Sequence, residues 1–214
     1  MDNNPGLLVI GANGGIGRQA VQLALAAGYH VTAVVRNPAN LPLIHPKLTL
    51  IKGDVLLPDT YAAHLTGKIA VISALGIKST QPTTLYSRGN AILLQEMKKA
   101  GARRIFFISA SGVEVSPLQP FFVRVLTKYV LQKILRNMYA DIRIMEDNIK
   151  ASDADWTIMR PPRLTDGPAT GKYRVAINAY LRRCLTISRA DVGHFMLDNL
   201  ENEQTFRTTV EIAY

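Results

Sequence analysis

Short apolar runs alternate with amphipathic segments along most of the 214-residue chain. Strand-like apolar runs occupy residues 7–10, 31–35, 48–51, 69–74, 105–109 and 156–159. Helix-like spacing of apolar positions occupies residues 16–27, 60–65, 85–100 and 121–151. The strand-like runs are continuously apolar rather than alternating, as is typical of strands buried on both faces. Parallel strands need crossover connections, so the alternation predicts an α/β fold: a doubly wound parallel sheet with helices on both faces.

The character of the sequence changes after residue 160. Residues 160–175 are rich in Pro, Gly and Thr, which predicts a loop. The elements expected after it are a strand at 184–187, a helix at about 190–200 capped by Ser188, and a strand at 205–213. This quarter is too small for a separate domain, so we expect residues 1–214 to form one domain. Residues 160–214 would form a small extension, a cleft wall or lid at the carboxyl edge of the sheet.

Glycines cluster in the turn between the first strand and the first helix. Gly11, Gly14, Gly15 and Gly17 stand in the stretch GANGGIG. In a strand–turn–helix context, glycines allow a tight turn and let backbone N–H groups approach a pyrophosphate at the positive end of the helix. The alternative is a compact turn without a ligand, but the flanking strand and helix favour a Rossmann-like dinucleotide site.

The end of the second strand bears on the choice between NAD(H) and NADP(H). Selectivity for NAD(H) calls for Asp or Glu there, whereas this chain has Arg36. A guanidinium can pair with a 2′-phosphate, and Arg18 in the first helical turn could assist. A solvated charge at a strand end is the other interpretation of Arg36. The sequence therefore favours NADP(H) as the cofactor over NAD(H).

Four later segments extend the pattern: GDV at 53–55, SALG at 73–76, SDADWTIMRPPRLTDG at 152–167 and SRADVGHFMLDNL at 188–200. Together with GANGGIG and VTAVVRNP, they resemble the atypical short-chain dehydrogenase/reductase superfamily. The chain is similar to its NAD(P)H-binding, NmrA-like group, which includes the flavin reductase/biliverdin-IXβ reductase family. The resemblance covers essentially the whole chain.

The resemblance implies which residues contact NADP. They are Gly11, Asn13, Gly14, Gly15, Ile16, Arg36, Asp54, Val55, Ala74, Leu75 and Gly76. The turn at Arg160, Pro161 and Pro162 would lie beside the nicotinamide. The resemblance also suggests a position near the active site for His194, although a lone His in an amphipathic helix is commonly structural.

Orthodox members of this superfamily use a Ser together with a Tyr-x-x-x-Lys pair, in which Tyr is the acid. Tyr129 and Lys133 have that spacing. In the NmrA-like relatives, however, the pair would fall closer to residue 152, where this chain has Met138 and Ile142. Tyr129 and Lys133 are therefore candidates for an acid pair, with the surface of an ordinary helix as the alternative.

A reductase needs no such pair when its acceptor is conjugated. A flavin, quinone or bilin-like acceptor can take hydride directly from NADPH, while water or the acceptor itself handles the proton. Ser109 and Ser111 lie at the end of the fifth strand and are the best candidates for hydrogen bonding to the nicotinamide or to an acceptor oxygen. Local bonds to the backbone are the alternative for both hydroxyls.

Composition narrows the set of partners. The formal net charge is +9, but the basic residues are dispersed and no nucleic-acid motif accompanies them, so we expect a phosphate-bearing cofactor instead. No apolar run approaches about 18 residues, so no membrane partner is expected. The single Cys184 and four scattered His residues offer neither a disulfide nor metal-ligand spacing, and they suit a cytoplasmic protein.

Two functions remain open at this point. The first is an NADP(H)-dependent oxidoreductase of the atypical short-chain type, acting on a small-molecule acceptor as a monomer or homodimer. The second is a non-catalytic NADP-binding redox sensor that regulates a partner, as the NmrA-like resemblance allows. A sugar-nucleotide epimerase would need a Tyr–Lys pair in the helix before WTIMRP, and the residues there oppose it.

Overall fold

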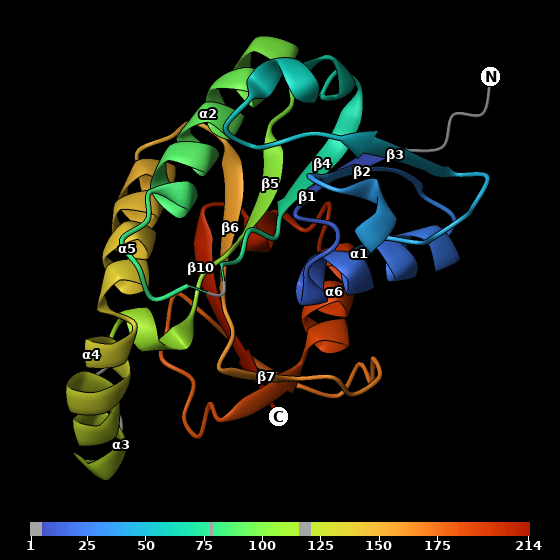
Figure 1. Ribbon diagram of the computed structural model, residues 1–214. Helices are drawn as coiled ribbons and strands as arrows, with labels where there is room; N and C mark the ends of the chain where they lie inside the picture. Colours follow the sequence, from blue (N-terminus) through green and yellow to red (C-terminus); the bar gives the residue numbers. More distant parts are fainter. Residues whose placement is uncertain (1–5, 78, 116–120) are drawn as a thin grey trace.

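The computed structural model describes residues 6–77, 79–115 and 121–214. An eight-stranded sheet runs through the molecule in the order β3-β2-β1-β4-β5-β6-β10-β8 (Figure 1). Its strands are β1 (Gly6–Ile10), β2 (His30–Val35), β3 (Leu48–Lys52), β4 (Lys68–Ser73), β5 (Arg104–Ile108), β6 (Asp155–Arg160), β8 (Arg174–Ile177) and β10 (Thr208–Ala213). Neighbouring strands are parallel except β8, which is antiparallel to β10. The predicted Rossmann-like sheet is therefore confirmed.

Helices cover both faces of the sheet. α1 (Gly15–Ala26) packs beside α6 (Arg189–Asp198) on one face, and α2 (Leu85–Ala100) beside α5 (Arg136–Lys150) on the other (Figure 1). Side chains of β1 alternate between the two layers: Leu7 and Val9 join the core under α1 and α6, and Leu8 and Ile10 join the core under α2 and α5. Burial on both sides explains why these strands are continuously apolar.

The predicted helix over residues 121–151 is interrupted. It consists of α3 (Phe121–Leu126), a π-helical turn at Thr127–Leu131, α4 (Gln132–Ile134) and, after a break at Leu135, α5. The first part extends away from the sheet (Figure 1), and Phe121 and Tyr129 are 79% and 63% exposed. Apolar periodicity indicates helix here, but only the α5 part has a sheet face against which a regular register packs. Within the described part of the chain, none of the helices is both long enough and apolar enough to cross a membrane.

Segments with short elements depart most from the expectations. The expected loop at 160–175 contains β7 (Arg163–Thr165), which pairs with β9 (Thr186–Ser188) in a separate two-stranded sheet. The expected helix at 60–65 is a pair of 3-10 turns, Pro58–Thr60 and Ala62–His64. A strand of only three residues leaves no periodic signal, so the sequence pattern misses β7, whereas β9 overlaps the strand expected at 184–187.

Two caps fix the helices around the sheet edge. Ser188 Oγ accepts a hydrogen bond from Asp191 N at 2.9 Å, which confirms the predicted N-cap of α6. Asp141 of α5 is buried and caps α2 from a neighbouring helix: its carboxylate accepts from the backbone N–H groups of Tyr86, at 2.8 Å, and Ser87, at 3.2 Å. This second cap couples α5 to the start of α2, where both helices approach the carboxyl edge of the sheet.

Candidate nucleotide-binding site

A cavity of about 280 Å³ opens at the carboxyl ends of β1, β2, β4 and β5. It is lined by Ile10, Gly11, Asn13, Gly14, Gly15, Ile16, Val34, Val35, Arg36, Gly53, Asp54, Val55, Ala74, Leu75, Gly76, Leu85, Tyr86, Ile108, Ser109, Ala110, Met138, Ile142, Leu164 and Arg189. The chain reverses its direction of winding between β1 and β4, which is the point where open α/β sheets bind nucleotides.

The turn after β1 forms one wall of the cavity and depends on glycine. Gly11 has φ +74°, and a Cβ there would lie 2.5 Å from the backbone oxygen of Ala74. Gly14 occupies the N-cap of α1, so the N–H groups of the first turn have no side-chain cap. At an uncapped helix start that lines a cavity, the free N–H groups and the helix dipole both favour negative charge.

Two arginines bring positive charge to the cavity. Arg36 lines it from the end of β2, and Arg189 lines it from the start of α6. The Arg189 side chain lies across Gly15, because a Cβ on Gly15 would be 2.5 Å from Arg189 Nε. Nη1 of Arg189 pairs with the largely exposed Asp166 at 2.6 Å. The lining carboxylate, Asp54, already accepts from the N–H of Leu56 at 2.9 Å. This charge balance suits a ligand with phosphate groups.

Most of the residues expected to hold the cofactor meet in this cavity. They are Gly11, Asn13, Gly14, Gly15, Ile16, Arg36, Asp54, Val55, Ala74, Leu75, Gly76 and Ser109. Gly17 lies behind the turn instead, packed against the backbone of Gly11. Arg18 also lies outside the lining, where its Nη2 donates to the carbonyl of Asn40 at 2.6 Å and holds the segment that follows Arg36.

The Arg160–Pro162 turn lies outside the cavity lining. Pro161 is buried, and its carbonyl accepts from Ser111 N at 3.0 Å. Ser111 begins the short 3-10 turn Ser111–Val113 and is not part of the lining either. The Arg160 side chain turns instead toward α5, into the polar network described below.

The remaining catalytic candidates are separated from the cavity. Tyr129 and Lys133 lie on the exposed segment before α5, and Tyr129 lines a different groove. His194 Nδ1 lies 2.9 Å from Asp198 Oδ2 and 3.1 Å from the hydroxyl of Tyr173, outside the cavity lining. The structure therefore brings Ser109, but not these three side chains, to the cavity.

Met138 and Ile142 line the cavity at the positions where NmrA-like relatives were expected to carry Tyr and Lys. Both side chains are apolar, so neither can exchange a proton. The tyrosine in the cavity lining is Tyr86, whose hydroxyl accepts a hydrogen bond from Ile77 N at 3.1 Å. Burial raises the pKa of Tyr86, so its hydroxyl is neutral at pH 7.

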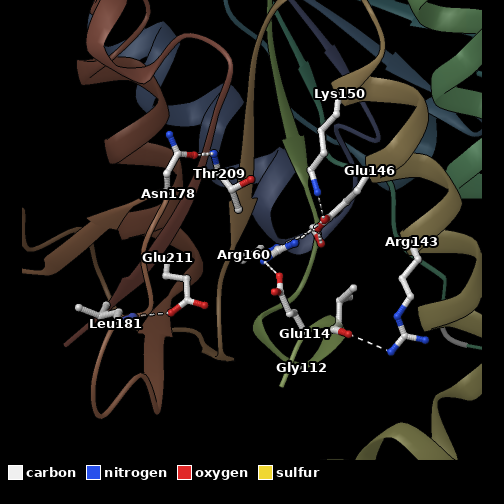
Figure 2. A network of polar contacts seen from close by, with 12 residues as sticks. Gly112, Glu114, Arg143, Glu146, Lys150, Arg160, Asn178, Leu181, Thr209 and Glu211 are labelled. Atoms are coloured by element: carbon white, nitrogen blue, oxygen red, sulfur yellow. Dashed lines mark hydrogen bonds and ion pairs between the residues drawn. The ribbon is translucent and has the colours of Figure 1, made fainter. Parts of the chain in front are cut away.

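A buried ionic network joins Arg160 at the end of β6 to Glu146 of α5 (Figure 2). Glu146 of α5 is 2% exposed and lies between Arg160 and Lys150. Arg160 donates to it in a bidentate arrangement, from Nε at 3.0 Å and from Nη2 at 2.5 Å. Arg160 Nη1 also pairs with Glu114 at 2.6 Å, so Glu114 is not the free loop charge that its exposed position suggests. The network joins the ends of β5 and β6 to α5.

The ionised state of Glu146 follows from its partners. Burial by itself would raise the pKa of this carboxyl, but the hydrogen bonds and charge of Arg160 outweigh burial, and the bond from Ser109 and the charge of Lys150 add to them. The pKa of Glu146 therefore lies below its ordinary value, and the group is a carboxylate at pH 7.

The sequence interpretation missed Arg189 and Glu146. Glu146 does leave a signal, because Ile142, Met145, Glu146 and Ile149 follow the spacing of one buried helix face. A carboxylate on an otherwise apolar stripe predicts a buried cationic partner. Arg189 leaves no comparable signal, since its approach to Gly15 depends on how α1 and α6 pack together.

The Rossmann-like fold and a cavity at the carboxyl edge of its sheet are typical of nucleotide-binding proteins. A family model described as NAD(P)H-binding matches residues 11–203. The chain belongs to this NAD(P)H-binding family.

Sequence and structure comparisons add relatives. The Photosystem II assembly factor Ycf39 of Guillardia theta is 36% identical over 218 residues, which cover 97% of this chain and 64% of that protein. The chain thus spans less than two thirds of the length of this relative. A short-chain dehydrogenase/reductase from Veillonella parvula DSM 2008 in complex with NADP shares the fold, with a TM-score of 0.83 at 19% identity over 98% of this chain and 94% of that chain. SP1627 from Streptococcus pneumoniae TIGR4, described as a candidate NADH-flavin reductase, has a TM-score of 0.76 at 24% identity over 98% of this chain and 99% of that chain.

Proposed function

We propose that the protein is a cytoplasmic NADP(H)-dependent reductase that passes hydride from NADPH to a conjugated acceptor such as a flavin, quinone or bilin. The observation that carries this proposal is the apolar pair Met138 and Ile142 in the cavity lining. Without an acid pair there, an alcohol-forming reduction lacks its proton donor, whereas a conjugated acceptor delocalises the charge and takes its proton from water. Bound NADPH supplies the hydride; the protein binds and orients the dinucleotide.

NADP(H) is the preferred cofactor in this proposal. Arg36 lies at the cavity end of β2, where an acidic residue would bond the ribose hydroxyls of NAD(H) and repel a 2′-phosphate. Arg18 supports the same segment through its bond to Asn40. The pyrophosphate would meet the start of α1, with Arg189 as a cationic partner from α6.

Replacing Arg36 by Asp tests the cofactor assignment. We expect Arg36→Asp to weaken NADP⁺ binding by at least about tenfold, because a charge-assisted bond worth about 1.5–3 kcal/mol is replaced by repulsion. NAD⁺ binding should stay level or tighten. The dissociation constants of both dinucleotides, measured by calorimetry, check the ratio. Lys172→Asp makes the same change of charge in an exposed loop outside the cavity and should leave the ratio unchanged. An unchanged ratio in Arg36→Asp would refute the role given to Arg36.

Reductase activity is tested directly with a panel of acceptors. NADPH is mixed with the protein and FMN, FAD, a benzoquinone, a naphthoquinone or biliverdin, and the absorbance near 340 nm is followed. We expect NADPH oxidation with at least one of these acceptors. Tight NADPH binding without oxidation across the whole panel would contradict the reductase proposal.

A non-catalytic NADP-binding regulator is the second candidate. The observation that favours it is the likeness to Ycf39, which is named as an assembly factor rather than as an enzyme. The apolar pair Met138 and Ile142 suits this function too, since a sensor needs no proton donor. A regulator should bind NADP(H) tightly, oxidise none of it with the acceptor panel, and change its affinity for a partner protein with the oxidation state of the dinucleotide.

A further inference from the structure

Ser109 has a single hydroxyl proton, which it donates in a hydrogen bond to the carboxylate of Glu146. The residue is 6% exposed and lines the cavity from the end of β5. Its Oγ donates to Oε1 of Glu146 at 2.6 Å. Among the described residues, Ser109 Oγ makes no other hydrogen bond. The backbone N–H of Ser109 donates to the carbonyl of Met159 at 2.8 Å, which fixes the position from which the side chain reaches Glu146.

The bond to Glu146 keeps the Ser109 hydroxyl proton from pointing into the cavity. Oε1 accepts from Ser109 and from Arg160 Nε, and Oε2 accepts from Arg160 Nη2 and, at 3.3 Å, from Lys150. A carboxylate offers about four acceptor positions, so its capacity is filled. If the Ser109 hydroxyl turned toward the cavity, two oxygen atoms would face each other at 2.6 Å with no proton between them. Only a protonated Glu146 would relieve that repulsion, and the bidentate Arg160 opposes protonation.

The oxygen that Ser109 presents to the cavity therefore carries lone pairs only. A ligand group placed against it must be a hydrogen-bond donor. Of the two polar atoms on the nicotinamide carboxamide, the amino group donates and the carbonyl oxygen accepts. The nicotinamide end of a dinucleotide bound across this sheet lies toward β4 and β5, beyond the pyrophosphate at the start of α1.

We propose that Ser109 acts toward the bound cofactor purely as a hydrogen-bond acceptor, and that its partner is the amino group of the nicotinamide carboxamide. This inference rests on the proposed NADP(H) binding and deepens it. It assigns Ser109 to orienting the nicotinamide ring and removes it as a proton donor to the acceptor. Glu146 and Arg160 become positioning residues, because they set the direction in which the Ser109 hydroxyl points.

The test compares NADP⁺ with its 3-acetylpyridine analogue, in which a methyl group replaces the amino group and the carbonyl is kept. Dissociation constants are measured by calorimetry, without turnover. The wild-type protein should prefer NADP⁺ by about tenfold, the value of one hydrogen bond with a buried partner. In Ser109→Ala the preference should fall close to one, through weaker binding of NADP⁺ alone. Ser111→Ala removes a neighbouring hydroxyl outside the cavity lining and should keep the wild-type ratio.

Each other outcome identifies what has failed. Equal weakening of both dinucleotides in Ser109→Ala would mean that Ser109 donates to the shared carbonyl, and a wild-type ratio near one would mean that it does not contact the amino group; either result overturns the inference. If Ser109→Ala binds NADP⁺ normally and keeps the wild-type ratio, the inference about Ser109 fails but the NADP(H) proposal stands. If the wild-type protein does not bind NADP⁺, the inference and the NADP(H) proposal both fail. Glu146→Gln provides a second test: its amide can donate to Ser109, which frees the hydroxyl proton for the cavity, so the preference for NADP⁺ should fall below the wild-type value.

Discussion

Gly17→Ala is expected to destabilise the protein and to weaken dinucleotide binding, although helix propensity alone predicts the opposite. Gly17 lies in the first turn of α1, where alanine is favoured over glycine by about 1 kcal/mol. A Cβ at this position, however, would overlap the carbonyl oxygen of Gly11 and lie 2.9 Å from its carbonyl carbon. Both atoms belong to the backbone, and the carbonyl oxygen of Gly11 is held in place because it accepts a hydrogen bond from Gly14 N at 2.9 Å. The clash therefore outweighs the gain in propensity.

The expected net loss is about 1–3 kcal/mol in the free energy of unfolding, as for overpacking in a well-packed region. Displacing Gly11 also moves the N–H groups of the first turn, so the dissociation constant of NADP⁺ should rise more than about tenfold. Urea denaturation and calorimetry measure the two effects. Gly76→Ala is the matched control for stability, since it lies in the same cavity but a Cβ there meets no atom within 4 Å. A stabilised Gly17→Ala would show that the turn is looser than its contacts indicate.

Local signals explain why so much of the fold could be predicted from the sequence. The strands from β1 to β6 are short, largely apolar and separated by turn residues, so each can be recognised without knowing its neighbours. The glycines after β1 and the Arg36 at the end of β2 are equally local, because the first βα turn and the next strand end have fixed places in this fold. Those two signals predict the part of the lining at the first turn and the end of β2, whereas Asp54, Val55 and the residues at 74–76 were expected from the family resemblance.

Long-range packing determines the features of the fold and the site that the sequence did not predict. The pairing of β7 with β9 and the approach of Arg189 to Gly15 join residues from distant parts of the chain. The direction of the Ser109 hydroxyl depends on Glu146, which reaches it from another element. Hydroxyl-rich strand ends predict a polar site, but the donor or acceptor character of each hydroxyl is determined by buried partners that periodicity does not reveal.

Arg160→Met is expected to have the largest effect on stability. It removes the bidentate partner of Glu146, a carboxylate that is 2% exposed, and leaves Lys150 at 3.3 Å as its remaining cation. Breaking one side of a buried ion pair costs about 3–5 kcal/mol, because the other charge stays buried without compensation. Urea denaturation at pH 7 should show a loss of that size. Lys98→Met breaks the pair between Lys98 and Asp153, whose side chains are mostly exposed, and should leave the unfolding transition in place.

The pH dependence of Arg160→Met separates a buried charge from a simple packing defect. In the wild-type protein the pKa of Glu146 lies below 4.5, so its contribution to stability is complete above about pH 4.5 and is lost as the pH falls through the lowered value. In Arg160→Met, burial should raise the pKa of Glu146 above 4.5. Acidification then protonates Glu146 and removes its unpaired buried charge. The loss in the free energy of unfolding relative to wild type should therefore become smaller between pH 7 and pH 5. Adding Glu146→Leu removes the stranded charge and should restore more than half of the loss at pH 7. A deficit that stays constant with pH, or a double variant no more stable than Arg160→Met, would mean that the Arg160 side chain stabilises the protein through its packing rather than through its charge.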